Sequence, residues 1–200
     1  MTTKMPLPTT LAGKHVALGP LTAAHVPDLF AALDGDEEVW RWLGGTMPRT
    51  EAEMLALVKS LKADEDAGLL TAFAVVSQET GRAVGWTTYL DTPGYPESVE
   101  IGWTWYGKSV WRTAVNTECK LLLLTHAFDG LGLDRVQLKT DHLNQRSQDA
   151  ILRLGAKMEG TLRHQRRRAD GSWRNTVYFS ILSDEWPDIS ENLVERLARG

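Results

Sequence analysis

The stretch 99–128 constrains the fold more than any other part of the chain, because it joins a strand pattern to a helix pattern across a short polar break. Apolar residues alternate with others over 99–106, which predicts a β-strand. A glycine and two polar residues at 107–109 interrupt it, and from Asn116 the pattern is that of a largely apolar helix. Residues 111–116 should therefore lie at a helix N-terminus, where unpaired backbone N–H groups and the helix dipole favour an anion such as phosphate.

An ordinary capped helix, with Thr113 or Asn116 as the cap, is the alternative interpretation of this stretch. A second unit of similar kind follows. A strand pattern over 135–140 leads into a polar segment and then into a short helix over 148–154, which Gly155 ends. Two such units in succession favour a sheet with helices packed against it.

The remaining patterns predict a mixed α+β fold with a mostly antiparallel central sheet of about seven strands and helices on both faces. Further strands are expected over 15–18, 70–77, 83–90, 156–167 and 172–182. Further helices are expected over 23–33, 37–43, 51–67 and 190–199, with 184–187 closing the sheet. A proline-rich loop over 91–96 and a turn over 168–171 connect neighbouring strands.

Length and composition fit one globular domain. The 200 residues are 42% hydrophobic, enough for a sizeable core, with 1–11 as a flexible lead-in and 12–200 as the domain. A net charge of −4 argues against nucleic acid as a partner. A single cysteine, no apolar run of about 18 residues and no secretion signal lead us to expect a cytoplasmic protein without a membrane segment. The five histidines are scattered, so no metal site is expected.

Five segments carry a family resemblance, and they occur in the same order as in that family: EIGWTW, WRTAVNTE, HAFDGLGLDRVQLKT, DHLNQRSQDAILRLGA and MEGTLR. The sequence resembles the GNAT acyltransferases over roughly residues 12–185, in particular the branch that includes the ribosomal-protein N-terminal acetyltransferases. The resemblance implies acetyl-CoA, or another acyl-CoA, as cofactor. It also implies direct transfer of the acyl group to a primary amine, either a protein N-terminus or a small molecule, without an acyl-enzyme intermediate.

The loop expected to bind the cofactor's pyrophosphate departs from the family pattern Q/R-x-x-G-x-G/A, whose positions fall on Ser109, Arg112 and Ala114. Only Ala114 fits. Arg112 replaces a glycine whose missing Cβ lets phosphate approach, although its guanidinium could instead contact the phosphates. A non-catalytic acyl-CoA-binding or sensor module is therefore the alternative function. The resemblance places cofactor contacts at Trp103, Arg112, Thr113, Ala114, Val115, Asn116, Thr117, Asn144 and Ser147.

Glu100 is the candidate general base, because it lies on the central strand beside the expected position of the acyl group. An alkylammonium has a pKa near 10, so an acceptor amine benefits from a base that removes its proton. The alternative is a strand glutamate that faces solvent or pairs with an arginine. Asp91 and His126 are weaker candidates, and His126 lies among leucines where a packed histidine is the commoner case.

Asn144 and Ser147 match the N-x-x-S element of the family. By the resemblance, Asn144 would bond an amide of the pantetheine arm, and Ser147 would donate to the thioester sulfur and stabilise the leaving thiolate. Both residues could instead serve only as helix caps. Tyr178 is an alternative proton donor, whereas Cys119 is expected in the core without a histidine partner.

The resemblance makes the first helices the wall of the acceptor pocket, with Trp40 and Trp42 as candidates to hold an aromatic or cationic group. The alternative is that both tryptophans pack within a helical hairpin. The basic run 163–168 is interpreted as a solvated hairpin, or as a patch for an acidic substrate, an RNA partner or the 3′-phosphate of the cofactor. The identity of the amine and the formation of a homodimer are left open.

Overall fold

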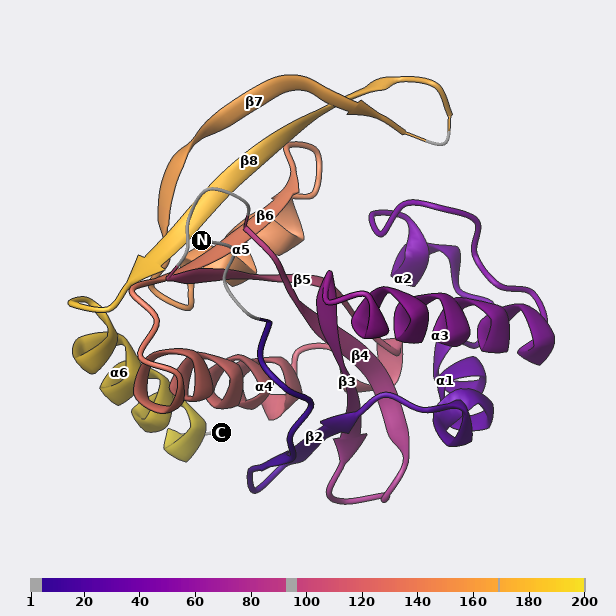
Figure 1. Cartoon of the computed structure of the whole chain (residues 1–200), viewed down its shortest axis with the longest axis horizontal. Helices are drawn as coiled ribbons and strands as arrows, with labels where there is room; N and C mark the ends of the chain where they lie inside the picture. Colours follow the sequence, from indigo (N-terminus) through magenta and orange to yellow (C-terminus); the bar gives the residue numbers. More distant parts are fainter. Residues whose placement is uncertain (1–4, 93–96, 169, 200) are drawn as a thin grey trace.

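A computed structural model describes residues 5–92, 97–168 and 170–199. Its core is one eight-stranded sheet with the order β1-β2-β3-β4-β5-β6-β8-β7 (Figure 1). All neighbouring strands are antiparallel except β5 and β6, which are parallel. The strands are β1 Leu11–Ala12, β2 Val16–Pro20, β3 Leu70–Ser77, β4 Ala83–Leu90, β5 Ser98–Tyr106, β6 Arg135–Asp141, β7 Lys157–Arg167 and β8 Trp173–Leu182.

Helices cover both faces of the sheet, which confirms the predicted fold class (Figure 1). One face carries α1 Val26–Leu33, α2 Glu37–Trp40 and α3 Glu51–Asp66. The other face carries α4 Ala114–Thr125, α5 Gln145–Leu152 and α6 Trp186–Arg199. Single turns of helix precede α1 at Ala23–His25 and α4 at Lys108–Val110, and a π-helical turn at His126–Gly130 extends α4.

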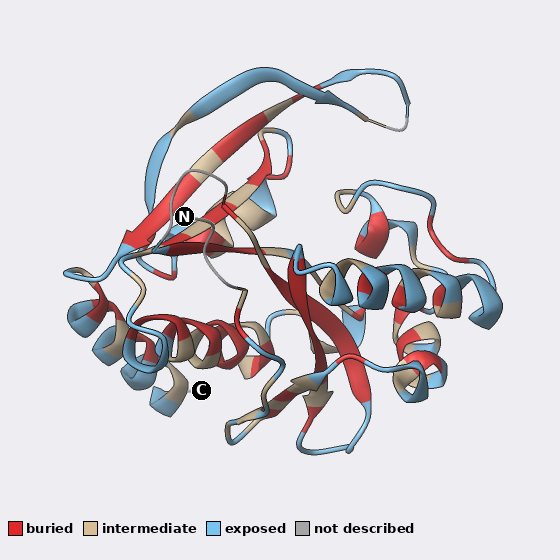
Figure 2. Cartoon of the chain, in the orientation of Figure 1, coloured by how far each residue is buried: buried red, intermediate tan, exposed pale blue. Residues whose placement is uncertain are grey.

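The alternation of side chains along the central strands divides the apolar residues between two cores. On β3, Phe73 and Val75 face the core that contains α4, whereas Ala72 and Ala74 face the core that contains α1 and α3. Both β3 and β4 are buried along nearly their whole length (Figure 2), and most of their residues are apolar, as expected of strands that are covered on both faces.

A β-bulge in β5 changes the alternation that the sequence predicts over 99–106. Val99 and Ile101 lie in the core with α4, but Trp105 lies in the opposite core. The register with β4 shifts between the pairs Thr88–Gly102 and Trp86–Trp105, so β5 holds one extra residue there. Trp103, at the bulge, has φ 48° and is 48% exposed. The prediction of one unbroken apolar face is therefore wrong beyond Gly102.

Three helices begin earlier than the sequence predicts. Helix α4 starts at Ala114 with Thr113 as its N-cap, and α5 starts at Gln145 with Asn144 as its N-cap. Helix α6 starts at Trp186, so 184–187 does not close the sheet. Pro187 lies in the first turn of α6, where proline is tolerated because the N–H group that it lacks would have no partner there.

The described part of the predicted lead-in contacts the folded body. Pro6 is buried, its carbonyl oxygen accepts a 2.5 Å hydrogen bond from the Thr71 hydroxyl, and Leu11 begins β1. Residues 1–4 lie outside the described residues. So does most of the predicted 91–96 loop, of which only 91 and 92 are described, and so does residue 169 of the predicted 168–171 turn.

Candidate active site

Strands β5 and β6 separate soon after they meet. They pair only over 98–100 and 135–137, and beyond Glu100 neither strand has the other as a neighbour (Figure 1). The two chain segments then lead to different helices, β5 to α4 and β6 to α5. The sheet therefore opens between its two parallel strands. The N-terminus of α4, which follows β5, lies on one side of the opening, and the N-terminus of α5, which follows β6, lies on the other.

Glu100 lies at the last paired position before this opening and is 3% exposed. Its Oε2 accepts a 2.9 Å hydrogen bond from Gln137 Nε2 and forms a 2.8 Å ion pair with Lys139 Nζ. Its Oε1 is buried without a hydrogen-bond partner among the described residues. A Cβ at Gly102 would lie 2.8 Å from Oε1, so the carboxylate occupies space that this glycine leaves free. Glu100 thus faces neither solvent nor an arginine.

The Glu100 carboxylate lies on the sheet face opposite α4. Along β6, Val136 and Leu138 point into the core with α4, so Gln137 and Lys139 point to the other face. Tyr178 is the register partner of Lys139 on β8, which puts this candidate proton donor on the same face. Sequence reasoning missed Gln137 and Lys139, because their approach to Glu100 depends on the pairing of strands far apart in the chain.

The weaker candidate bases are placed differently. Asp91 is partly exposed and its N–H donates to the Leu69 carbonyl oxygen. His126 stacks on Tyr89 at 5.9 Å between ring centroids, and burial lowers the pKa of its imidazole. A histidine packed this way beside α4 agrees with the structural interpretation rather than the catalytic one.

The N-terminus of α4 has a well-formed cap. The Thr113 hydroxyl accepts a 3.3 Å hydrogen bond from Val115 N and donates to Val110 O at 2.8 Å. Arg112 just before it has φ 61°, a left-handed conformation that favours glycine. The position thus keeps the backbone shape that a glycine would give, with an exposed arginine side chain. A surface pocket lined by Ser109, Thr113 and Lys14 adjoins this turn.

A buried carboxylate on α4, which sequence reasoning did not assign a role, fixes the helix to the sheet. Glu118 is 6% exposed and accepts hydrogen bonds from the backbone N–H groups of Lys14, His15 and Val16 at 2.9, 2.6 and 2.7 Å. A Cβ at Gly13 would lie 2.4 Å from the Glu118 carboxyl carbon, so the turn before β2 needs glycine there. These contacts hold the first turns of α4 in position.

The N-terminus of α5 carries the N-x-x-S element. Asn144 is 8% exposed and its Oδ1 accepts a 3.2 Å hydrogen bond from Ser147 N, so Asn144 is a helix cap. The Ser147 hydroxyl is partly exposed and makes no hydrogen bond within the described part of the chain. A cofactor contact by either residue stays a prediction.

The two candidate tryptophans of the acceptor wall differ. Trp40 is 6% exposed and packs edge-on against Trp86 and Trp105 at 5.7 Å, so it belongs to the core, and the prediction of an exposed tryptophan pair is wrong for it. Trp42 is partly exposed, with the Arg41 guanidinium 4.9 Å from its ring centroid. Only Trp42 is left as an accessible aromatic of this candidate pair.

Other side chains bear on which chemistry is available. Within the described ranges, no group of three or more histidine, cysteine, aspartate or glutamate side chains could hold a metal ion. Cys119 is fully buried, and burial raises the pKa of its thiol, which disfavours a thiolate nucleophile. No helix in the described parts of the chain is long and apolar enough to cross a membrane.

The sheet opens between two parallel strands, and a capped helix N-terminus and a buried carboxylate lie at the opening. Together with the family model that matches the chain, this geometry defines an acyltransferase. The model is that of the acetyltransferase (GNAT) domain, and it matches residues 15–157. The chain therefore belongs to the GNAT acetyltransferase family.

Solved structures agree with this assignment. A GCN5-related N-acetyltransferase from Brucella melitensis is 28% identical, with a TM-score of 0.90 over 98% of this chain and 88% of that one. A protein from T. thermophilus that is assigned to the acetyltransferases is 34% identical, with a TM-score of 0.85 over 96% of this chain and 98% of that one. Mycobacterium smegmatis RimJ in complex with CoA-disulfide shares the fold at 22% identity, with a TM-score of 0.82 over 95% of each chain. No curated protein sequence matches the chain.

Proposed function

We propose that this protein is an acetyl-CoA-dependent N-acetyltransferase that moves an acetyl group directly to a primary amine, either a protein N-terminus or a small molecule. One observation carries the proposal: Glu100 Oε1 is a buried acceptor without a partner in the described residues, at the opening between β5 and β6. A buried carboxylate oxygen left unpaired is costly. An amine N–H at this position would satisfy it.

The residues at the opening fit the phosphates and the arm of acetyl-CoA. The first N–H groups of α4, over 114–117, would bind the pyrophosphate, with the Arg112 guanidinium beside them. The pantetheine arm would lie between β5 and β6, next to Trp103 on one side and to Asn144 and Ser147 on the other. Bound there, acetyl-CoA supplies an acetyl group activated as a thioester.

Glu100 has the proton-accepting role. Lys139 and Gln137 hold its Oε2, which fixes the orientation of the carboxylate. Oε1 then stays available to take the proton that the acceptor amine must lose. Ser147 is the donor for the departing sulfur, and Tyr178, beside Lys139, is the second candidate donor.

The test is thermal unfolding with acetyl-CoA, followed by a panel of amines with detection of the released thiol. Because a ligand that binds only the native state stabilises it, acetyl-CoA should raise the melting temperature in a concentration-dependent way. No shift at millimolar acetyl-CoA, another acyl-CoA or free CoA would refute the proposal. A shift without turnover of any peptide or small amine would favour the non-catalytic acyl-CoA-binding module.

A further inference from the structure

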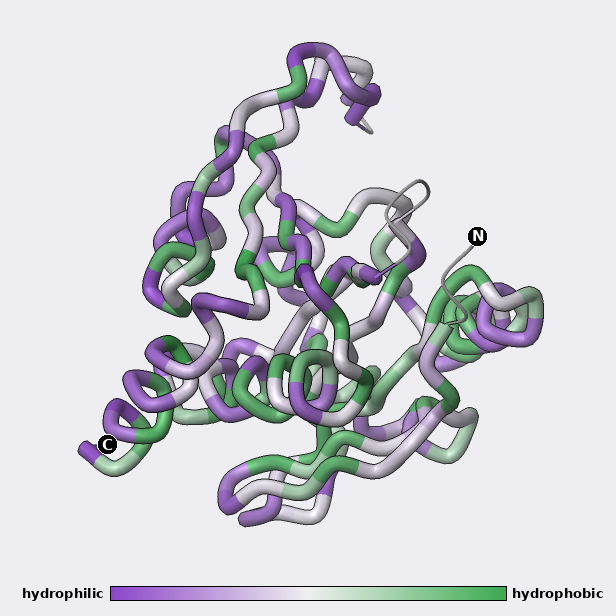
Figure 3. The backbone as a smooth tube through the Cα atoms, turned by 60° about the vertical axis from the view of Figure 1, so that its left-hand side comes forward, coloured by the Kyte–Doolittle hydropathy of each residue, from purple (hydrophilic) through white to green (hydrophobic). Residues whose placement is uncertain are grey.

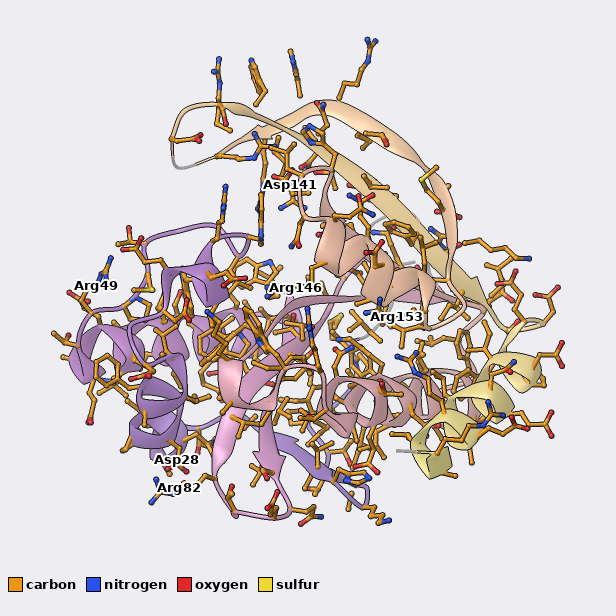
Figure 4. All side chains as sticks on the ribbon, turned by 180° about the vertical axis from the view of Figure 1, so that it is seen from behind. Asp28, Arg49, Arg82, Asp141, Arg146 and Arg153 are labelled. Carbon is orange, nitrogen blue, oxygen red and sulfur yellow. The ribbon has the colours of Figure 1, made fainter. Side chains whose placement is uncertain are left out.

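The basic run 163–168 lies at the end of β7, in the hairpin that extends from the sheet toward the α2 side of the molecule (Figure 1). The hairpin is largely hydrophilic toward its tip (Figure 3). Two of its arginines, Arg167 and Arg168, already have partners. Arg168 forms a bidentate pair with Asp141 at 2.6 and 2.8 Å, and Asp141 lies beneath the hairpin (Figure 4). Arg167 lies 3.8 Å from the ring centroid of Trp173 and donates to Gly171 O.

Four arginines of the hairpin form no ion pair with a carboxylate among the described residues: Arg163, Arg166, Arg167 and Arg174. Of these, Arg166 on β7 and Arg174 on β8 stand opposite each other. They are direct register partners, so their side chains leave the same face of the sheet. Arg174 is only 6% exposed, and its Nε donates to Thr176 Oγ1 at 2.9 Å. Asp141 attracts Arg174, but both oxygens of that carboxylate are occupied by Arg168.

This arrangement is unfavourable for the protein alone. Like charges directly opposite each other on antiparallel strands repel. A buried guanidinium loses hydration, which the single hydrogen bond from Arg174 Nε to Thr176 and the attraction to a carboxylate that Arg168 already occupies replace only in part. Burial, together with the nearby Arg166, lowers the pKa of Arg174. An anion between the two guanidinium groups would remove the repulsion and pair the buried charge.

The pair lies on the acceptor side of the sheet. Thr176 and Tyr178 alternate with Val177, which points into the core with α4, so Arg174 shares a face with Tyr178. Ser180 on β8 is aligned with Glu100 through Gln137, and Arg174 is six residues from Ser180, about 20 Å at about 3.3 Å per residue. The Arg166 guanidinium reaches across to the segment after α2, where a Cβ at Gly44 would lie 3.3 Å from its Nη2. The pair thus faces the gap between the hairpin and the α2 side.

We propose that Arg166 and Arg174 bind an anionic group, a carboxylate or a phosphate, of the acceptor whose amine reacts beside Glu100. The inference rests on the proposed function and narrows its substrate class to amines that carry a negative charge about 20 Å from the nitrogen, a span that follows from the strand rise. An extended peptide reaches this distance with an acidic residue about six positions after its N-terminus.

Inorganic phosphate is the probe, compared with chloride at equal ionic strength in thermal unfolding of the protein saturated with acetyl-CoA. Wild type should be stabilised by about 3 °C more than Arg174→Gln, as expected for a site with a millimolar dissociation constant. Arg166→Gln changes an exposed residue, so it should fold and should lose the stabilisation by phosphate even if Arg174→Gln folds poorly. Arg163→Gln removes one exposed charge from the same strand and should keep it.

Equal responses of wild type, Arg166→Gln and Arg174→Gln would refute the anion site, and so would loss of the response in Arg163→Gln. If phosphate stabilises the free protein but not the protein saturated with acetyl-CoA, the anion belongs to the cofactor and the acceptor assignment is wrong. Phosphate should inhibit turnover competitively with the amine and not with acetyl-CoA. The proposed function has a separate criterion, since it fails when acetyl-CoA does not bind or when no amine is acetylated, whatever phosphate does.

Discussion

The guanidinium of Arg146 lies 3.6 Å from the ring centroid of Trp111. Trp111 belongs to the loop that follows β5, and Arg146 belongs to α5, which follows β6. The contact therefore spans the opening between the two parallel strands, and Figure 4 shows Arg146 between α5 and the α2 side. A 3.5 Å contact from Arg146 Nη1 to Glu38 Oε1 extends the link to α2.

The first prediction is that Trp111→Ala weakens acetyl-CoA binding by releasing one side of the opening from the other. The melting-temperature shift produced by acetyl-CoA should fall to about half or less of the wild-type shift, in line with the logarithmic dependence on affinity. Trp173→Ala removes a comparable stack, that of Arg167 on Trp173, from the distant hairpin and is the matched control. Equal effects of the two substitutions on acetyl-CoA binding would show that the Trp111 contact has no special role.

The second prediction concerns Arg112, which has φ 61° before α4. At most backbone positions glycine makes a protein less stable than alanine does, because glycine loses more conformational entropy on folding. At this positive φ, however, alanine is strained by about 1 kcal/mol and glycine is not. Arg112→Gly should therefore be more stable to urea than Arg112→Ala, the reverse of the usual order. The opposite order would show that this residue does not hold a left-handed conformation in solution.

The third prediction tests the anion site at α4 through Ala114, its first residue. Ala114→Asp places a carboxylate where the pyrophosphate is expected and should abolish the acetyl-CoA melting shift. The free protein should lose little stability, because acidic residues suit a helix N-terminus. Arg112→Ala should weaken the shift modestly if the arginine contacts phosphate. Tighter binding by that variant would mean that Arg112 obstructs the site.

The fourth prediction is a pH dependence from Asp141. Burial alone would raise the pKa of this carboxyl, but Arg168 and the Leu143 N–H bind it and hold its pKa below the ordinary 3.8. A depressed folded-state pKa adds stability that is present above about pH 4 and is lost as the pH falls through the folded value. Asp141→Asn should thus cost about 2 kcal/mol at pH 7 and progressively less toward pH 3 in urea unfolding. Asp184→Asn, at an exposed position, should cost little at any pH.

Much of the fold follows from local patterns. Strands β3 and β4 match the predicted 70–77 and 83–90, because apolar runs between turn residues leave few alternatives. Thr113 as a cap was one of the two predicted choices. The bulge at Trp103 was missed because its local sequence keeps the alternation, and only the pairing with β4 reveals the extra residue.

The site was harder to predict than the fold. Glu100 could be singled out from its strand, but its pairing with Lys139 depends on the parallel alignment of β5 with β6. The resemblance pointed to Trp40 without information on burial, and the packing against Trp86 decided its place. Arg174 lies outside the basic run and was not noticed, because its proximity to Arg166 comes from hairpin register.

The fifth prediction separates the base from the residue expected to stabilise the leaving group. Glu100→Gln keeps the size of the side chain and removes only its charge and basicity, so the acetyl-CoA melting shift should stay near that of wild type. Ser147→Ala should change acetyl-CoA binding, because the serine is expected beside the thiol. Its loss of turnover should be smaller than that of Glu100→Gln and should depend less on pH.

The dependence of kcat/KM on pH for Glu100→Gln, on any amine that turns over, tests the central claim most directly. If Glu100 Oε1 takes the amine's proton, kcat/KM should fall by about 10²-fold near neutral pH. The loss should shrink as the pH rises, because more of the amine is then already neutral. A Glu100→Gln enzyme with the wild-type kcat/KM at every pH would contradict the account.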